Sequence, residues 1–258
     1  MRQDCADGRQ LAQALGLANG MSLALNPVTP DYAEAIPMAL SKAVPKRRAE
    51  FAAGRRAARA ALLAGGWPVD KNNPDAAMPA ALLHGCAGQG KTELDRLGRD
   101  GAALDDRGKI AILGIGADGL PIWPRGVLGS ISHCRDLAGA LVAPSACLQL
   151  LGLDIEEILT PDQALEIAPM VMPEAQPMAS DAAMALNVTR VFSAKEALFK
   201  ALFPHIRQIK EFSAARALWQ GSDLSLALTE DWGDYGRNQT FAVHQDCGPA
   251  HVITAIWR

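Results

Sequence analysis

Residues 189–203 read TRVFSAKEALFKALF, and this stretch contains the strongest helix signal in the second half of the chain. Its apolar positions recur at the three- and four-residue spacing of one helix face: Ala194, Leu198, Ala201 and Leu202. Because Pro204 follows, the pattern predicts an amphipathic helix that ends there. Glu196 and Lys200 lie one turn apart on another face, where they form either a surface ion pair or part of a functional site.

Residues 151–156, LGLDIE, predict a strand just upstream of this helix. The two-residue period places Gly152, Asp154 and Glu156 on one face and the apolar residues on the other. Two neighbouring carboxylates repel each other unless a cation lies between them, and Gly152 leaves room for a ligand to approach. Such oxygens suit Mg²⁺, which takes further oxygens from substrate phosphates. A solvated strand face is the alternative.

Residues 45–64, PKRRAEFAAGRRAARAALLA, predict a second long helix, with Pro45 at its start and two glycines after its end. Cations dominate its polar positions, with Glu50 as the single acid: Lys46, Arg47, Arg48, Arg55, Arg56 and Arg59. A solvated face would explain some of this charge. On a chain of net charge −3, however, such a concentration of cations indicates an anionic ligand.

Composition places the chain among globular proteins, because 49% of its 258 residues are hydrophobic and 21% are charged. The negative net charge argues against a nucleic-acid-coating protein, and no apolar run approaches the 18 residues of a membrane span. Five widely spaced cysteines without a CxxC pair argue against a disulfide framework or a structural zinc site. We therefore expect a soluble, cytoplasmic protein.

Residues 85–92, GCAGQGKT, match the phosphate loop GxxxxGK[ST], in which Lys91 would neutralise a phosphate and Thr92 would bind magnesium. That loop needs a β-branched strand before it and a helix after it. The preceding MPAALLH has no Val or Ile, and the following TELDRLGRDG allows barely two helical turns. We interpret the match as a glycine-rich loop, and a P-loop nucleotidase is the alternative function.

Further strand signals are separated by turn residues. They occur at KIAILGI (109–115), IWPRGVLGSISH (122–133), LAGALVA (137–143), LQLLGLDIE (148–156), LSLAL (224–228), FAVH (241–244) and VITAIW (252–257). Residues 160–187 are rich in Pro and Met, and we expect them to be irregular or weakly helical.

Four motifs in order carry a resemblance: KRRAEFAAGRRAAR (46–59), WPRGVLGSISHC (123–134), LGLDIE and FSAKEALFKALFP (192–204). Together they resemble the Sfp-type 4′-phosphopantetheinyl transferases, in particular the branch of enterobactin synthetase component D. The resemblance implies an α+β fold of two similar halves related by a pseudo-twofold axis, each a small antiparallel sheet packed on a long helix. One half would span residues 1–145, with an insertion at about 69–118, and the other residues 146–258.

The resemblance also implies the site. Asp154, Glu156 and Glu196 would be the metal ligands, for Mg²⁺ or alternatively Mn²⁺, and Glu196 and Lys200 would be catalytic. The coenzyme A ligands would be Arg47, Arg55, Arg59, Ser132, His133 and Lys200. Lys195 occupies a family lysine position to which we assign no role.

The implied reaction transfers 4′-phosphopantetheine from coenzyme A to a serine of an acyl or peptidyl carrier protein and releases 3′,5′-adenosine bisphosphate. Acyl or peptidyl carrier proteins of siderophore, other peptide or fatty-acid synthesis would be the partners, and the enzyme would be a monomer. A non-catalytic module that binds coenzyme A or docks carrier proteins is a further alternative.

Overall fold

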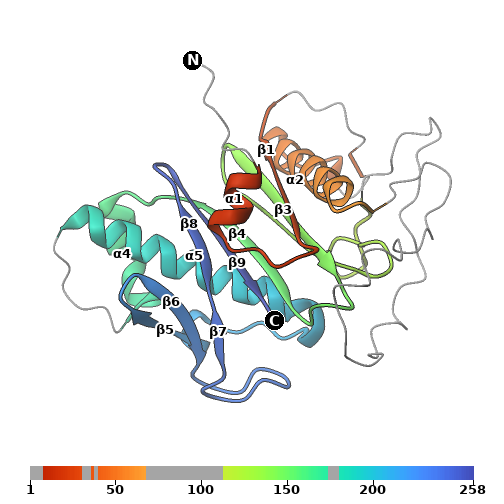
Figure 1. Cartoon of the computed structure of the whole chain (residues 1–258). Helices are drawn as coiled ribbons and strands as arrows, with labels where there is room; N and C mark the ends of the chain where they lie inside the picture. Colours follow the sequence, from red (N-terminus) through yellow and green to blue (C-terminus); the bar gives the residue numbers. More distant parts are fainter. Residues whose placement is uncertain (1–7, 31–35, 38–39, 68–112, 174–179) are drawn as a thin grey trace, which may run out of the picture. The chain divides into compact units, whose positions relative to one another are not determined.

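The computed structural model describes residues 8–30, 36–37, 40–67, 113–173 and 180–258 (Figure 1). Helices and strands are mixed, and the strands form three small antiparallel sheets. The α+β class expected from the sequence is therefore confirmed. The chain forms two compact units: an N-terminal unit (residues 17–131 and 135–149) and a C-terminal unit (residues 1–16, 132–134 and 150–258). The division at residue 145, which concerns the family halves, stays a prediction.

In the N-terminal unit, helix α2 (Pro45–Ala64) packs on a sheet with the strand order β1-β3-β2. The strands are β1 (Ser22–Pro27), β2 (Val127–His133, whose last two residues belong to the C-terminal unit) and β3 (Leu137–Pro144). The helix has the predicted bounds. Small alanines on its inner face lie directly against the sheet, and all four of the following are fully buried: Ala52, Ala53, Ala57 and Ala61.

The core of the C-terminal unit is helix α5 (Asp181–Ile206) on a sheet with the order β4-β9-β8 (Figure 1). These strands are β4 (Leu151–Glu157), β8 (His244–Cys247) and β9 (His251–Trp257). The predicted apolar stripe of α5 is confirmed, because Ala194, Leu198, Ala201 and Leu202 are each 0% exposed. Pairing with β9 places Thr254 beside Asp154, in the middle of the sheet.

The expectation of irregular or weakly helical structure over residues 160–187 underestimates the described part of that range, which forms regular helices. Helix α4 occupies Pro161–Val171 and begins with a capping box, in which Thr160 and Gln163 satisfy each other's backbone amides. Helix α5 already starts at Asp181, capped by Ser180, and continues two residues past Pro204. Both helices begin at capping residues that stabilise their first turn, whereas the Pro and Met content of the segment suggested loops.

A third sheet, β5-β6-β7, completes the C-terminal unit. Its strands are β5 (Ala215–Gln220), β6 (Asp223–Leu228) and β7 (Thr240–Ala242), and the 3₁₀ turn η3 (Phe212–Ala214) precedes them. Helix α1 (Gly8–Ala14) contacts β8. The predicted strand FAVH divides at Val243 into the end of β7 and the start of β8, which belong to different sheets.

Three other sequence features have separate outcomes. Among the described helices, none combines the length and the apolar character needed to cross a bilayer. Cys134 and Cys247 form no disulfide bond, whereas Cys147 is disulfide-bonded, which the cysteine count did not predict. The GCAGQGKT match and residues 69–112 of the insertion lie outside the described residues.

Candidate functional site

The site in the C-terminal unit depends on an unusually close approach of β4 to α5. A Cβ atom at Gly152 would lie 2.0 Å from the Ala197 carbonyl oxygen and 2.9 Å from the Ala201 amide nitrogen. The interpretation of Gly152 as space for a ligand is therefore wrong, because the backbone of α5 fills that space. The missing side chain instead allows the strand and the helix to come close enough for their acidic and basic residues to meet.

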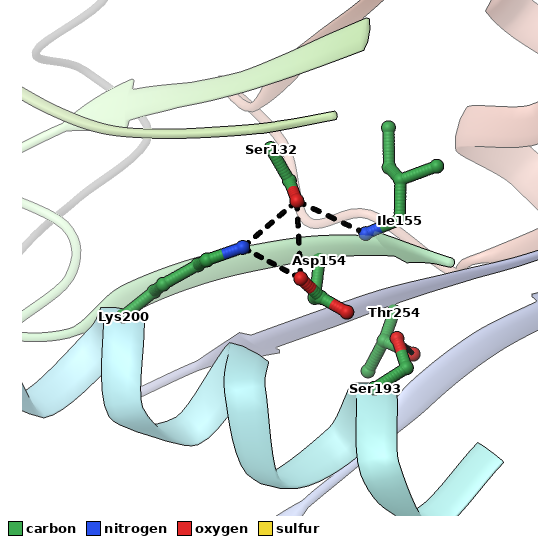
Figure 2. A network of polar contacts seen from close by, with 6 residues as sticks. All are labelled: Ser132, Asp154, Ile155, Ser193, Lys200 and Thr254. Carbon is green, nitrogen blue, oxygen red and sulfur yellow. Dashed lines mark hydrogen bonds and ion pairs between the residues drawn. The ribbon is translucent and has the colours of Figure 1, made fainter. Parts of the chain in front are cut away.

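Asp154, Ser132 and Lys200 form the centre of this site (Figure 2). The Lys200 Nζ lies 2.6 Å from Asp154 Oδ1 and 2.8 Å from the Ser132 hydroxyl, which in turn donates to Asp154 Oδ1 at 3.0 Å. Asp154 and Ser132 are 1% and 3% exposed, so solvent screens these contacts weakly. Lys200 thus pairs with a buried aspartate on β4, not with Glu196 one turn earlier on its own helix.

Glu156 and Glu196 place two more carboxyl groups in the field of Asp154. The pKa of Glu156 is raised to about 8, mainly by burial and also by the charges of Asp154, Glu196 and Glu157, against the opposing effect of Lys200. Burial also raises the pKa of Glu196, which Lys200 lowers and Asp154 raises. The three acids therefore affect one another electrostatically, and Lys200 is the positive charge that lowers the pKa of both glutamates.

The arrangement has the properties expected of a cation site. Asp154 Oδ2 is buried and, within the part of the chain that the structure describes, has no hydrogen-bond partner. A buried carboxylate oxygen without a partner is costly, and a divalent cation would remove that cost. Together with the carboxylates of Glu156 and Glu196, it supplies the all-oxygen set that Mg²⁺ or Mn²⁺ prefers. The donor atoms of the predicted ligands therefore suit the ion in kind, although the three carboxylates do not all lie within 4.8 Å of one another in this structure.

A pair of buried hydroxyl groups lies next to Asp154, between α5 and β9. The Ser193 and Thr254 side-chain oxygens lie 2.8 Å apart, and both residues are completely buried between α5 and the sheet. Gln245 donates to Thr254 at 2.9 Å and thereby connects β8 to this pair. Sequence analysis missed these residues. Ser193 lies three residues before Glu196, on nearly the same helix face, and that spacing was a usable signal. Thr254 required the register of β9.

An open cavity of about 170 Å³ borders Glu196. Its apolar lining includes Phe199, Phe212 and Trp232. Lys195 also lines it and is 6% exposed, because its Nζ donates to the backbone oxygens of Val171 at 2.7 Å and Phe212 at 2.8 Å. Lys195, whose role the sequence left open, therefore ties the end of α4 and the turn η3 to α5.

The predicted coenzyme A ligands on α2 lie in the N-terminal unit. Arg47 is exposed and lies 3.7 Å from Glu50. Arg55 is only 9% exposed: its Nε donates to the Leu113 carbonyl at 3.0 Å, and its guanidinium covers the Phe51 ring. Burial lowers the pKa of Arg55 to about 10, with a further contribution from Arg47. Arg55 thus already has a structural role in its own unit.

Arg59 is exposed on the same helix, and His133 is half-buried at the end of β2. The structure brings Ser132, Asp154, Glu156, Glu196 and Lys200 together in the C-terminal unit. The roles predicted for these residues, and those predicted for the α2 arginines and His133, stay predictions.

Comparison with known protein families gives matches over both parts of the chain. Residues 34–80 and 101–143 match the 4′-phosphopantetheinyl transferase N-terminal domain, and residues 150–252 match the 4′-phosphopantetheinyl transferase superfamily. The second match includes β4 and α5, and therefore every acid of the site described above.

Similar proteins agree with these matches. The chain is 38% identical to enterobactin synthase component D of Salmonella typhi over 60% of its own length and 75% of that protein. It is 34% identical to the 4′-phosphopantetheinyl transferase Svp of Streptomyces mobaraensis, covering 64% of this chain and 52% of that one. The transferase Npt of Nocardia iowensis is 32% identical over 47% of this chain and 55% of its own. With the acids, the lysine and both domain matches in one chain, this protein belongs to the 4′-phosphopantetheinyl transferase superfamily.

Proposed function

We propose that this protein transfers 4′-phosphopantetheine from coenzyme A to a serine of an acyl or peptidyl carrier protein and releases 3′,5′-adenosine bisphosphate. One observation carries the proposal most directly. In a chain of this family, the buried Oδ2 of Asp154 has no hydrogen-bond partner among the described residues, Oδ1 pairs with Lys200, and Glu156 and Glu196 add two carboxyl groups to the same electrostatic field. Such a site suits a cation and a polyanionic substrate together.

Asp154 Oδ2, Glu156 and Glu196 would hold the divalent cation. When bound, Mg²⁺ would neutralise the pyrophosphate of coenzyme A and the charge that develops on it during transfer. Mn²⁺ prefers similar ligands and could replace it. Lys200 carries the neighbouring positive charge and would contact a phosphate oxygen, as would His133 from the end of β2.

The chemical step needs a base for the serine hydroxyl. The serine oxygen forms a bond to the β-phosphorus while the bond from that phosphorus to the bridging pyrophosphate oxygen breaks, and the adenosine bisphosphate leaves. We assign the released proton to the carboxylate of Glu196. Glu196 is the candidate because it lies on α5 in the shared field of Asp154 and Lys200 and borders the cavity.

The cavity beside Glu196 offers a place for the pantetheine arm. Its volume of about 170 Å³ would enclose part of the arm. Its aromatic lining suits the dimethyl and methylene groups of the arm, and Glu196 at its border would keep the phosphate end near the acids. At the other end of coenzyme A, we assign the 3′-phosphate to Arg47, Arg55 and Arg59.

The finer family features belong to the same proposal. They are the pseudo-twofold relation of the two halves, a monomeric state, and carrier proteins of siderophore or nonribosomal peptide synthesis as partners. The name of the Salmonella typhi relative supports the last of these. The two alternative functions are not favoured: both domain matches are to transferase families, and the chain retains the acids and the lysine that a merely binding module would not need.

Mass spectrometry tests the proposal. The purified protein, coenzyme A and Mg²⁺ are incubated with an apo carrier protein. We expect the carrier to gain about 340 Da, the mass of one phosphopantetheine group on serine. The gain should disappear with EDTA and with Glu196→Gln. A wild-type protein that leaves several apo carriers of both types unmodified, while still binding coenzyme A, would contradict the proposal and favour the non-catalytic module.

A further inference from the structure

Ser132 has a hydroxyl group whose bonding capacity is already used within the protein. It donates its single hydrogen to Asp154 Oδ1 at 3.0 Å. It accepts from Lys200 Nζ at 2.8 Å and from the backbone amide of Ile155 at 3.2 Å (Figure 2). A serine hydroxyl has one hydrogen and two acceptor lone pairs, so these three contacts fill it. A phosphate oxygen would need that same hydrogen.

The contacts of Ser132 make the two oxygens of Asp154 different. Oδ1 receives both the Ser132 hydroxyl and the Lys200 ammonium, whereas Oδ2 is buried without a partner among the described residues. The Ile155 amide holds the Ser132 oxygen against the backbone immediately after Asp154, which fixes the geometry of the donor. With Oδ1 bonded twice, the carboxylate has one orientation and one oxygen left for a ligand.

We propose that Ser132 is a positioning residue for the metal site rather than a direct ligand of coenzyme A. Its hydroxyl holds Asp154 with Oδ2 turned toward the cation and holds Lys200 beside Oδ1, so that the lysine and the metal ion use different oxygens of one aspartate. This inference rests on the proposed function, because it assumes the cation. It deepens that function by assigning to a serine of the GSISH motif the orienting work that metal-ligating carboxylates generally require.

The test measures Mn²⁺ binding by electron paramagnetic resonance, and coenzyme A binding in EDTA by calorimetry. Ser132→Ala is compared with wild type and with Ser130→Ala. Ser130 lies two residues earlier on β2 and is also buried, at 6% exposed, so it is a matched control for loss of a buried hydroxyl. We expect Ser132→Ala to weaken Mn²⁺ binding by about 10-fold or more and to lower kcat. Coenzyme A affinity in EDTA should change far less, and Ser130→Ala should keep the Mn²⁺ affinity of wild type.

Ser132→Cys retains the shape of serine with a weaker donor, so it keeps the test valid if the alanine variant does not fold. Its Mn²⁺ affinity should fall between those of serine and alanine. If Ser132→Ala and Ser132→Cys both bind Mn²⁺ as tightly as wild type, the inference is overturned, whether or not their coenzyme A affinity falls. In that case the proposed function still stands if the wild-type protein binds Mn²⁺ and modifies a carrier protein. If wild type does neither, the proposed function itself fails.

Discussion

Gly152→Ala is the substitution whose consequence the structure fixes most sharply. The added Cβ would lie 2.0 Å from the Ala197 carbonyl oxygen, 1.4 Å inside the 3.4 Å at which ordinary contact begins. The atoms it meets belong to the α5 backbone, so no side chain can rotate away. The helix and β4 must separate, and overpacking of this kind costs about 3 kcal/mol. For a protein of this size, that corresponds to a melting temperature lower by roughly 6–12 °C.

The separation would also move Glu196, the residue before Ala197, away from Asp154. A misplacement of about 1 Å can reduce turnover by about 100-fold. Thermal denaturation and the carrier modification rate measure the two effects. Gly236→Ala is the control, because its Cβ would meet only Asp231 Oδ1 at an ordinary 3.8 Å. If Gly152→Ala melts within 2 °C of Gly236→Ala and keeps wild-type turnover, the argument from close packing is refuted.

Three further changes test other parts of the account. Lys195→Met should lower the free energy of unfolding by about 2 kcal/mol, because one buried and one partly buried backbone oxygen lose their ammonium donor; an unchanged urea midpoint would contradict this. Thr160→Ala should cost about 1 kcal/mol through loss of the α4 capping box, measured by the same urea titration, and no loss would show that the cap contributes nothing. Burial lowers the pKa of His244, which stacks on Trp257, so its contribution to stability is complete above pH 6.5 and is lost as pH falls through the folded-state pKa. His244→Phe keeps the stacking without the titration, and its melting temperature should therefore fall less than that of wild type between pH 7.5 and 5; parallel pH profiles would refute this.

Much of the fold followed from local patterns. The period of apolar residues in α5 and the alanine-rich sequence of α2 each specify one buried face, and the structure buries those faces. Helix α4 was missed because its two prolines were interpreted as loop signals. Pro161 occupies the first helical turn, where a missing amide costs nothing, and Thr160 supplies the cap.

The candidate site divides in the same way. Asp154 and Glu156 could be paired from the two-residue strand period, and Glu196 and Lys200 from the helix period, because both relations are local. The contact between Lys200 and Asp154 depends on how closely β4 approaches α5. That approach could be predicted only by recognising Gly152 as a position where the strand packs directly on the helix backbone. Thr254 lies opposite Asp154 because of the β4–β9 register, which no short stretch of sequence contains.

The central claim is that Asp154, Glu156 and Glu196 hold one divalent cation. Anomalous diffraction from crystals soaked in Mn²⁺ tests it most directly, because it locates the ion without reference to activity. We predict one strong peak on the order of 2.1 Å from Asp154 Oδ2 and from a carboxylate oxygen of each glutamate, with Lys200 still on Oδ1. A site with no peak at this position, or a peak that only one of the three acids contacts, would contradict the account.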